Sequence, residues 1–206
     1  RQVGKSTAVR NLSKRFDYFI EINFDEQSEY QNLFANTSDI NDLIEQLAII
    51  TQTEIIEGRT LVFLDEIQAS LPTISKLRYF YEKKPNLHVI AAGSLLEFAL
   101  SELPSFGVGR VRSLFMYPLS FIEFLGALNE KPLASIIQQS NSAKPINPIF
   151  HEKLKIYFKK FLIIGGMPQA VQTYVAKGDL LEVQRILDDL VISIEADFAK
   201  FRNRPP

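Results

Sequence analysis

Five residues near the start of the chain, Val3-Gly4-Lys5-Ser6-Thr7, have the types and spacing of residues that hold a chain of phosphates. They match the second half of the pattern G-x-x-x-x-G-K-[ST], in which glycine lets backbone N–H groups approach phosphate oxygens. In such a loop Lys5 would reach the β- and γ-phosphates, and the hydroxyl of Ser6 would bind Mg²⁺. The same residues could simply begin a helix, so their meaning depends on what else the chain carries.

A pair of carboxylates ends the segment Leu61-Val62-Phe63-Leu64-Asp65-Glu66. Four apolar residues followed by two acids are typical of a buried parallel strand, whose carboxyl end lies at the ligand-binding edge of an open α/β sheet. There Asp65 would bind Mg²⁺, mostly through water, and Glu66 would polarise the attacking water as general base. The alternative is a strand that ends in a solvated acidic turn or a helix cap.

Two further polar features follow later apolar runs. Ser94 could hydrogen-bond the γ-phosphate or the attacking water, and it could equally cap a helix expected at 94–103. Arg110 and Arg112 lie next to glycines, and arginine suits the charge on a transferring phosphoryl group. We favour Arg110, acting in cis or from a neighbouring subunit; the alternative is a surface turn with two solvated cations.

The segment Gly165-Gly166-Met167-Pro168 opens a helix in the second half of the chain. Proline in a first helical turn is common, and the glycines allow a bend before it. The functional interpretation places Gly166 and Pro168 against the adenine and ribose. Nucleotide binding would then tie this helical part of the chain to the phosphate loop.

The segments between these features alternate between short apolar runs and segments whose apolar residues have helical spacing. Short runs rich in β-branched and aromatic residues predict strands, and apolar positions three or four apart predict helices. This alternation indicates an α/β fold with a parallel sheet covered by helices on both faces. We expect strands at 18–24, 60–67, 87–94 and 111–120, and helices at 7–16, 39–52, 74–84, 94–103 and 121–128.

The pattern changes in the second half of the chain, where only helical spacings follow. We therefore expect an α/β core at 1–128, a linker at 129–150 and a small helical lid domain at 151–206. The linker is predicted from three prolines and the polar run Ser140-Asn141-Ser142.

Composition limits the classes of protein to consider. The chain has 206 residues, no cysteine and a net charge of −1. The lack of cysteine excludes a disulfide framework, and the net charge gives no overall field that points to nucleic acid or membrane. Its longest apolar runs are far shorter than a membrane span. The lack of cysteine suits a reducing compartment, and we expect a cytoplasmic protein with no membrane partner.

Five segments together resemble the prokaryotic AAA-like P-loop ATPases related to the STAND and archaeal-type ATPases. They are RQVGKST, LVFLDEIQ, HVIAAGSLLEFAL, VGRVRSLFMYPLSFIEFL and GGMPQAV. The resemblance implies a P-loop NTPase sheet of order 5-1-4-3-2 with a helical lid, and ATP and Mg²⁺ as cofactors. It implies these residues at the nucleotide: Lys5, Ser6 or Thr7, Asp65, Glu66, Ser94, an arginine and the turn of Gly166 and Pro168.

Such ATPases carry a first loop glycine on a preceding strand, and they continue into a nuclease-like domain. We therefore expect the chain to be part of a longer protein, in which roughly ten or more preceding residues supply the strand and the glycine.

The sequence thus predicts an Mg-dependent ATPase that acts as a nucleotide-driven switch, with ATP and ADP as ligands. The alternative is a non-hydrolysing nucleotide sensor that presents a surface to a protein partner or a second copy. A small-molecule kinase is a third class, but adjacent Asp65 and Glu66 fit water activation better. DNA contact is a weaker alternative, resting on Lys153, Lys155, Lys159 and Lys160; we expect these lysines to be solvated.

Overall fold

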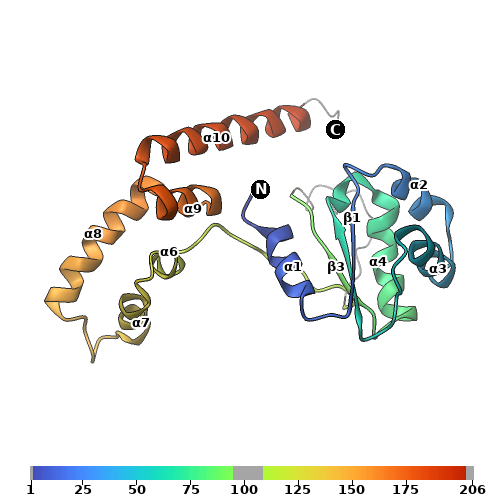
Figure 1. Cartoon of the computed structure of the whole chain (residues 1–206), viewed down its shortest axis with the longest axis horizontal. Coiled ribbons are helices and arrows are strands. Elements are labelled where there is room, and N and C mark those ends of the chain that lie inside the picture. Colours follow the sequence, from blue (N-terminus) through green and yellow to red (C-terminus); the bar gives the residue numbers. More distant parts are fainter. Residues whose placement is uncertain (1, 95–108, 203–206) are drawn as a thin grey trace. The chain divides into compact units, whose positions relative to one another are not determined.

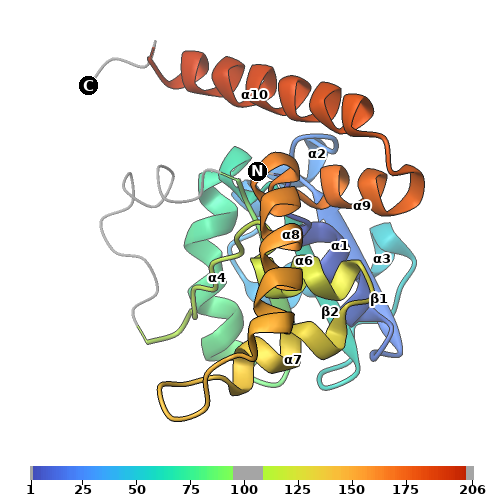
Figure 2. The same cartoon turned by 90° about the vertical axis from the view of Figure 1, so that its left-hand side faces the viewer.

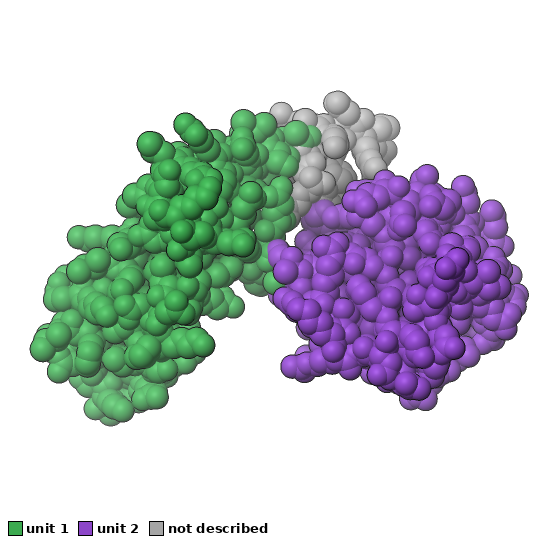
Figure 3. All heavy atoms as spheres, viewed as in Figure 1, with its two compact units in different colours: residues 1–3, 116–206 green, residues 4–115 purple. Residues whose placement is uncertain are grey.

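The computed structural model describes residues 2–94 and 109–202, with the side chains of 197–202 left out. The described chain divides into two units, one of residues 4–115 and the other of residues 116–206 with the first three (Figure 3). Each unit has its own apolar core and is described separately. The helix expected at 94–103 lies almost entirely outside the described residues.

Three parallel strands form the sheet of the 4–115 unit (Figure 1). They are β1 (Tyr18–Asn23), β2 (Thr60–Asp65) and β3 (His88–Ala91), in the order β1-β2-β3. Every residue of the central strand β2 is buried, as expected for a strand covered on both faces. The predicted α/β class with a parallel sheet is therefore confirmed, whereas the five-strand order is not observed among the described residues.

Helices cover the two faces of this sheet. On one face α1 (Lys5–Ser13) packs through Val9 against Leu61 and Phe63. The other face is covered by α2 (Glu29–Asn36), α3 (Ile40–Thr51) and α4 (Leu71–Lys83). Because side chains alternate along a strand, Val62 and Leu64 point to this second face and belong to its core.

The strand predicted at 111–120 is wrong, because these residues form no strand in the structure. Leu114 is 82% exposed, and Phe115 and Tyr117 are exposed as well. A strand forms only where a neighbour accepts and donates its backbone hydrogen bonds, and no described strand lies beside this segment. An apolar run therefore predicted a strand that, in the described chain, has no partner.

The second unit is helical, and it begins earlier than expected. Its helices are α6 (Phe121–Ala127), α7 (Lys131–Gln139), α8 (Pro148–Ile164), α9 (Pro168–Lys177) and α10 (Leu180–Arg202). Helix α6 belongs here, because Phe124 joins the core of α8 to α10 and Leu125 packs with Leu133 and Leu154. Figure 2 shows α6 and α7 beside α8.

The linker expected at 129–150 is wrong over much of its length, because it contains α7. Pro132 stands in the first turn of this helix, where a missing N–H costs nothing. The two units meet in the chain at Phe115 and Met116 rather than near residue 128. No helix in the described parts of the chain has both the length and the apolar character to cross a bilayer.

Candidate functional site

The phosphate-loop residues begin helix α1 at the carboxyl edge of the sheet. Gly4 adopts φ 90° and ψ 21°, a left-handed conformation that favours glycine, and its carbonyl accepts the first helical hydrogen bond from Ala8 at 2.9 Å. No side chain caps the first N–H groups of α1. They remain available to an anion, and the positive end of the helix dipole favours one there.

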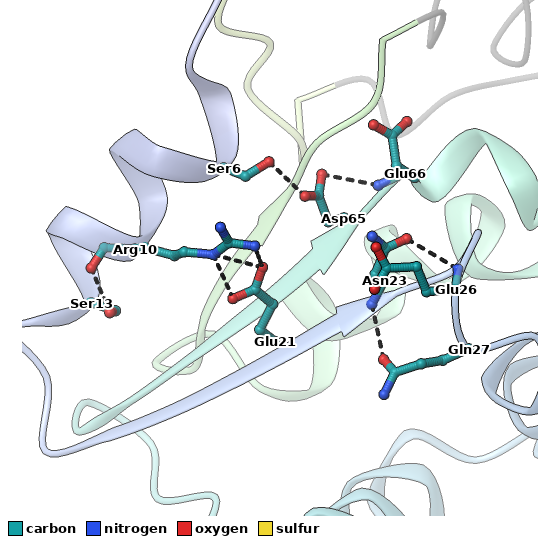
Figure 4. Close-up of polar contacts among 9 residues, drawn as sticks. All are labelled: Ser6, Arg10, Ser13, Glu21, Asn23, Glu26, Gln27, Asp65 and Glu66. Carbon is teal, nitrogen blue, oxygen red and sulfur yellow. Dashed lines mark hydrogen bonds and ion pairs between the residues drawn. The ribbon is translucent and has the colours of Figure 1, made fainter. Parts of the chain in front are cut away.

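Ser6 and Asp65 meet at this edge, although 59 positions separate them in the sequence (Figure 4). The Ser6 hydroxyl donates to Asp65 Oδ2 at 2.6 Å. The other carboxylate oxygen, Oδ1, accepts from the Glu66 N–H at 3.0 Å. Asp65 is only 5% exposed, so these two donors satisfy a buried carboxylate.

Glu66 lies directly beside this pair and is half-buried. Its backbone is left-handed, with φ 49°, which is uncommon for a residue other than glycine. Its Oε2 accepts from Ser94 Oγ at 3.1 Å and from Gln68 Nε2 at 2.5 Å. Ser94, which follows β3, therefore has Glu66 as its partner in this structure, and its contact with a phosphate or the attacking water stays a prediction.

Lys5, Thr7 and Val3 complete the loop segment. Lys5 is half-buried, and its side-chain ammonium makes no hydrogen bond or ion pair with another residue of the described chain. Thr7 is exposed and Val3 is buried. Of the two hydroxyls after Lys5, the structure brings that of Ser6 to Asp65.

Asn23 is a polar residue of this edge that the sequence analysis missed. It ends β1 and pairs in register with Asp65 of β2. Its Oδ1 accepts from the N–H of Asp25 at 3.0 Å and from the N–H of Glu26 at 3.4 Å, and the second of these bonds is drawn in Figure 4. Together they fix the turn after the strand. The sequence could have indicated Asn23, because it lies near the end of the predicted strand at 18–24. In a parallel sheet this strand ends at the same edge as the strand at 60–67 that contains Asp65.

An ion pair fixes α1 to β1 beneath the edge. Arg10 Nε lies 3.0 Å from both carboxylate oxygens of Glu21, and Nη2 lies 2.7 Å from Oε1 (Figure 4). Hydrogen bonding to Glu21 and its charge raise the pKa of the Arg10 guanidinium. The pair holds the helix that carries Ser6 against the strand that carries Asn23.

Within the unit of residues 4–115, Arg110 does not lie at the carboxyl edge of the sheet. Its Nε lies 2.5 Å from Glu82 Oε1, in the last turn of α4. Helix α4 starts close to the carboxyl edge and runs 13 residues, or about 20 Å, toward the start of β3. Arg110 therefore lies at the far end of α4 from Asp65, and Arg112 is exposed.

The turn of Gly166 and Pro168 has a structural role inside the helical unit. Gly166 accepts a hydrogen bond from Leu119 N at 2.7 Å, and a Cβ at this position would lie 2.1 Å from Leu119 O. Only glycine fits so close to another backbone. Pro168 stands in the first turn of α9, as predicted. Contact of this turn with a nucleotide stays a prediction.

The oxygen atoms at the sheet edge suit a magnesium ion that arrives with phosphate. Mg²⁺ is usually bound by one or two protein oxygens together with water and substrate phosphates, and Ser6 and Asp65 supply oxygens of that kind. No group of three or more His, Cys, Asp or Glu residues able to hold a metal occurs among the described residues. The oxygens of Ser6 and Asp65 fit an ion whose other ligands come from water and phosphate.

Comparison with known proteins identifies the first part of the chain. A family model described as an AAA domain matches residues 1–125, which is more than half of the chain. No curated protein and no solved structure gives a significant match.

Proposed function

The chain belongs to the AAA domain family, and we propose that it binds ATP with Mg²⁺ and hydrolyses it as a nucleotide-driven switch. The observation that carries this proposal is the hydrogen bond from Ser6 to Asp65. It joins the hydroxyl of the phosphate loop to the carboxylate at the end of a neighbouring strand. These are the two groups that share a magnesium ion in P-loop nucleotide hydrolases.

Each residue at the edge has a role in this reaction. The N–H groups that follow Gly4 would cradle phosphate oxygens, and Lys5 would pair with the β- and γ-phosphates. Ser6 and Asp65 would hold Mg²⁺, which when bound offsets negative charge on the phosphoryl oxygens. Glu66 would accept a proton from the water that attacks the γ-phosphorus.

The resemblance to P-loop ATPases also bears on the order of the strands. In the order 5-1-4-3-2, strands β1, β2 and β3 would be the second, third and fourth strands, which are neighbours in that order. We propose that the sheet of this chain follows it, and the parallel pairing of β1 with β2 and of β2 with β3 supports this proposal.

DNA binding receives less support. Lys153 Nζ lies 3.1 Å from Glu130, and Lys155 Nζ lies 3.0 Å from Glu152. These acidic neighbours offset the charge that would attract a phosphate backbone. We therefore keep nucleotide hydrolysis as the proposed activity and treat DNA contact by α8 as a secondary question for a salt-dependent binding assay.

The substitution Glu66→Gln tests the proposal. It keeps the size of the side chain but removes the general base, so ATP affinity should stay within about twofold while turnover falls about 100-fold or more. Affinity is measured with a fluorescent ATP analogue and turnover by phosphate release. Hydrolysis at the normal rate would refute the role of Glu66, and ATP binding without any turnover in the unsubstituted protein would favour a nucleotide sensor.

A further inference from the structure

The backbone turns sharply after β2, and this turn places the side chain of Gln68 beside that of Glu66. Glu66 takes its left-handed conformation, and a single 3₁₀ turn, η1 (Ile67–Ala69), follows. The end of β3 fastens this turn, because Ile67 N donates to Ala92 O at 3.0 Å and Ala92 N donates to Leu64 O at 2.9 Å. Gln68 is thereby fixed between Glu66 and Gly93.

In the side-chain amide of Gln68, the nitrogen makes a hydrogen bond and the oxygen makes none with the described residues. Its Nε2 donates to Glu66 Oε2 at 2.5 Å. Its Oε1 is buried and has no hydrogen-bond partner among the described residues. Rotating the amide would put Oε1 against the carboxylate, where two acceptors repel, so the bond to Glu66 fixes the orientation. An unpaired buried oxygen is unfavourable, and such an oxygen in a folded protein calls for a reason.

Gly93 provides the space for that oxygen. A Cβ at position 93 would lie 2.3 Å from Gln68 Oε1, closer than any real contact. The backbone of Gly93 is not in the left-handed region, so alanine suits its conformation and the conflict is with Gln68 alone. A methyl group at position 93 would therefore displace the Gln68 amide from its place beside Glu66.

We propose that Gln68 is a positioning residue for Glu66. Gln68 and Ser94 both donate to Oε2 of Glu66, and no described residue donates to Oε1. Two donors on one oxygen fix the rotation of the carboxylate and leave the other oxygen to accept the proton of the attacking water. This inference rests on the proposed hydrolysis, in which the placement of the base limits the rate.

The test is a double-mutant cycle between positions 68 and 93. We expect Gln68→Ala and Gly93→Ala each to lower kcat about 10- to 100-fold with KM little changed, because both release the carboxylate. In the Gln68→Ala background the methyl group at 93 meets no amide, so the double variant should be no slower than Gln68→Ala alone. Gln68→Met, which keeps the length of the side chain without its donor, controls for lost packing.

A second measurement reports on the contact without turnover. The side-chain NH₂ signal of Gln68 in a ¹⁵N-labelled sample should shift in Glu66→Ala and in Gly93→Ala, and should stay in place in Ser13→Ala, a change remote from the edge. The inference is overturned if Gln68→Met retains kcat within twofold of the unsubstituted protein. It is also overturned if Gly93→Ala slows the Gln68→Ala variant as strongly as it slows the unsubstituted protein.

The proposed function can fail separately. If the unsubstituted protein hydrolyses no ATP, both proposals are overturned. If Glu66→Gln abolishes turnover but Gln68→Met does not lower it, hydrolysis stands and only the positioning role is refuted.

Discussion

The hydroxyl of Ser6 and the carboxylate of Asp65 lie 2.6 Å apart, although 59 positions separate the two residues in the sequence. Ser6 lies at the start of α1 and Asp65 at the end of β2. The parallel sheet produces this contact. It places the start of α1 beside the carboxyl end of β2, where Asp65 is buried and its second oxygen is bound by the next backbone N–H. Under the proposed function, Asp65 would exchange the Ser6 donor for Mg²⁺ brought by phosphate.

The first prediction concerns Ser6→Ala. We expect the affinity for ATP with Mg²⁺ to fall at least about tenfold, or about 1.4 kcal/mol, because a ligand oxygen is lost. The affinity without Mg²⁺ should change much less. Titration of a fluorescent ATP analogue with Mg²⁺ and with EDTA separates the two.

The same substitution should lower the free energy of unfolding by roughly 1–3 kcal/mol, since Asp65 Oδ2 loses its donor. Ser13→Ala is the matched control, because Ser13 follows on the same helix and its hydroxyl bonds only to Arg10 O. An equal loss of affinity with and without Mg²⁺ would contradict the metal-binding role of Ser6.

The second prediction is a pH dependence of stability centred on Asp39. This residue caps α3, accepting from Asn41 N at 2.7 Å, and its other oxygen accepts from Lys83 Nζ at 2.7 Å. The hydrogen bond from Lys83 and that from Asn41 lower the pKa of Asp39 from 3.8 to about 2. A carboxyl whose pKa is lower in the folded state stabilises it above pH 4, and this stabilisation is lost as the pH falls to about 2.

Asp39→Asn isolates this effect, because asparagine caps a helix nearly as well but carries no charge. We expect the variant to melt at a lower temperature than the unsubstituted protein at pH 7, and the two to converge as the pH approaches 2. Circular dichroism melting curves at pH 7, 4 and 2.5 measure the difference. A difference that does not shrink with falling pH would exclude the charge of Asp39 as its cause.

The third prediction compares two glycines of the helical unit. Gly166→Ala should destabilise that unit by about 1–3 kcal/mol, because the new methyl group meets the backbone of Leu119. Gly126 lies in α6 with open space around its Cβ position, so Gly126→Ala should change stability by less than about 1 kcal/mol and in the favourable direction. Urea unfolding followed by circular dichroism measures both, and equal effects would refute the packing argument for Gly166.

The elements next to the site could be predicted from sequence because their signals are local. A run of apolar residues that ends in Asp65 and Glu66 predicts a buried strand and its edge, and β2 has that form. The helix predicted at 39–52 is likewise present as α3, which Asp39 caps. Such signals need no knowledge of distant residues.

Other features depend on partners that are distant in sequence or on backbone geometry. Residues 111–120 have the composition of a strand, but a strand also needs a neighbour, which composition does not reveal. Gln68 reaches Glu66 because the backbone of Glu66 is left-handed. A glutamate in the sequence does not predict that conformation, which favours glycine. The prolines at 129–150 indicated a linker, although Pro132 begins a helix.

The last prediction concerns Arg110, whose guanidinium is paired with Glu82 at the end of α4 far from Asp65. If this arginine serves the reaction, it must act on the nucleotide of a neighbouring subunit, as arginine fingers do in trans. We therefore expect Arg110→Ala and Glu66→Gln each to be nearly inactive alone. A mixture of the two variants should regain phosphate release, because one type of interface then combines an intact Glu66 with an intact Arg110. The recovery should grow with protein concentration, since it requires association. A mixture that stays as inactive as its parts, at concentrations where the unsubstituted protein is active, would exclude action in trans and remove Arg110 from the site.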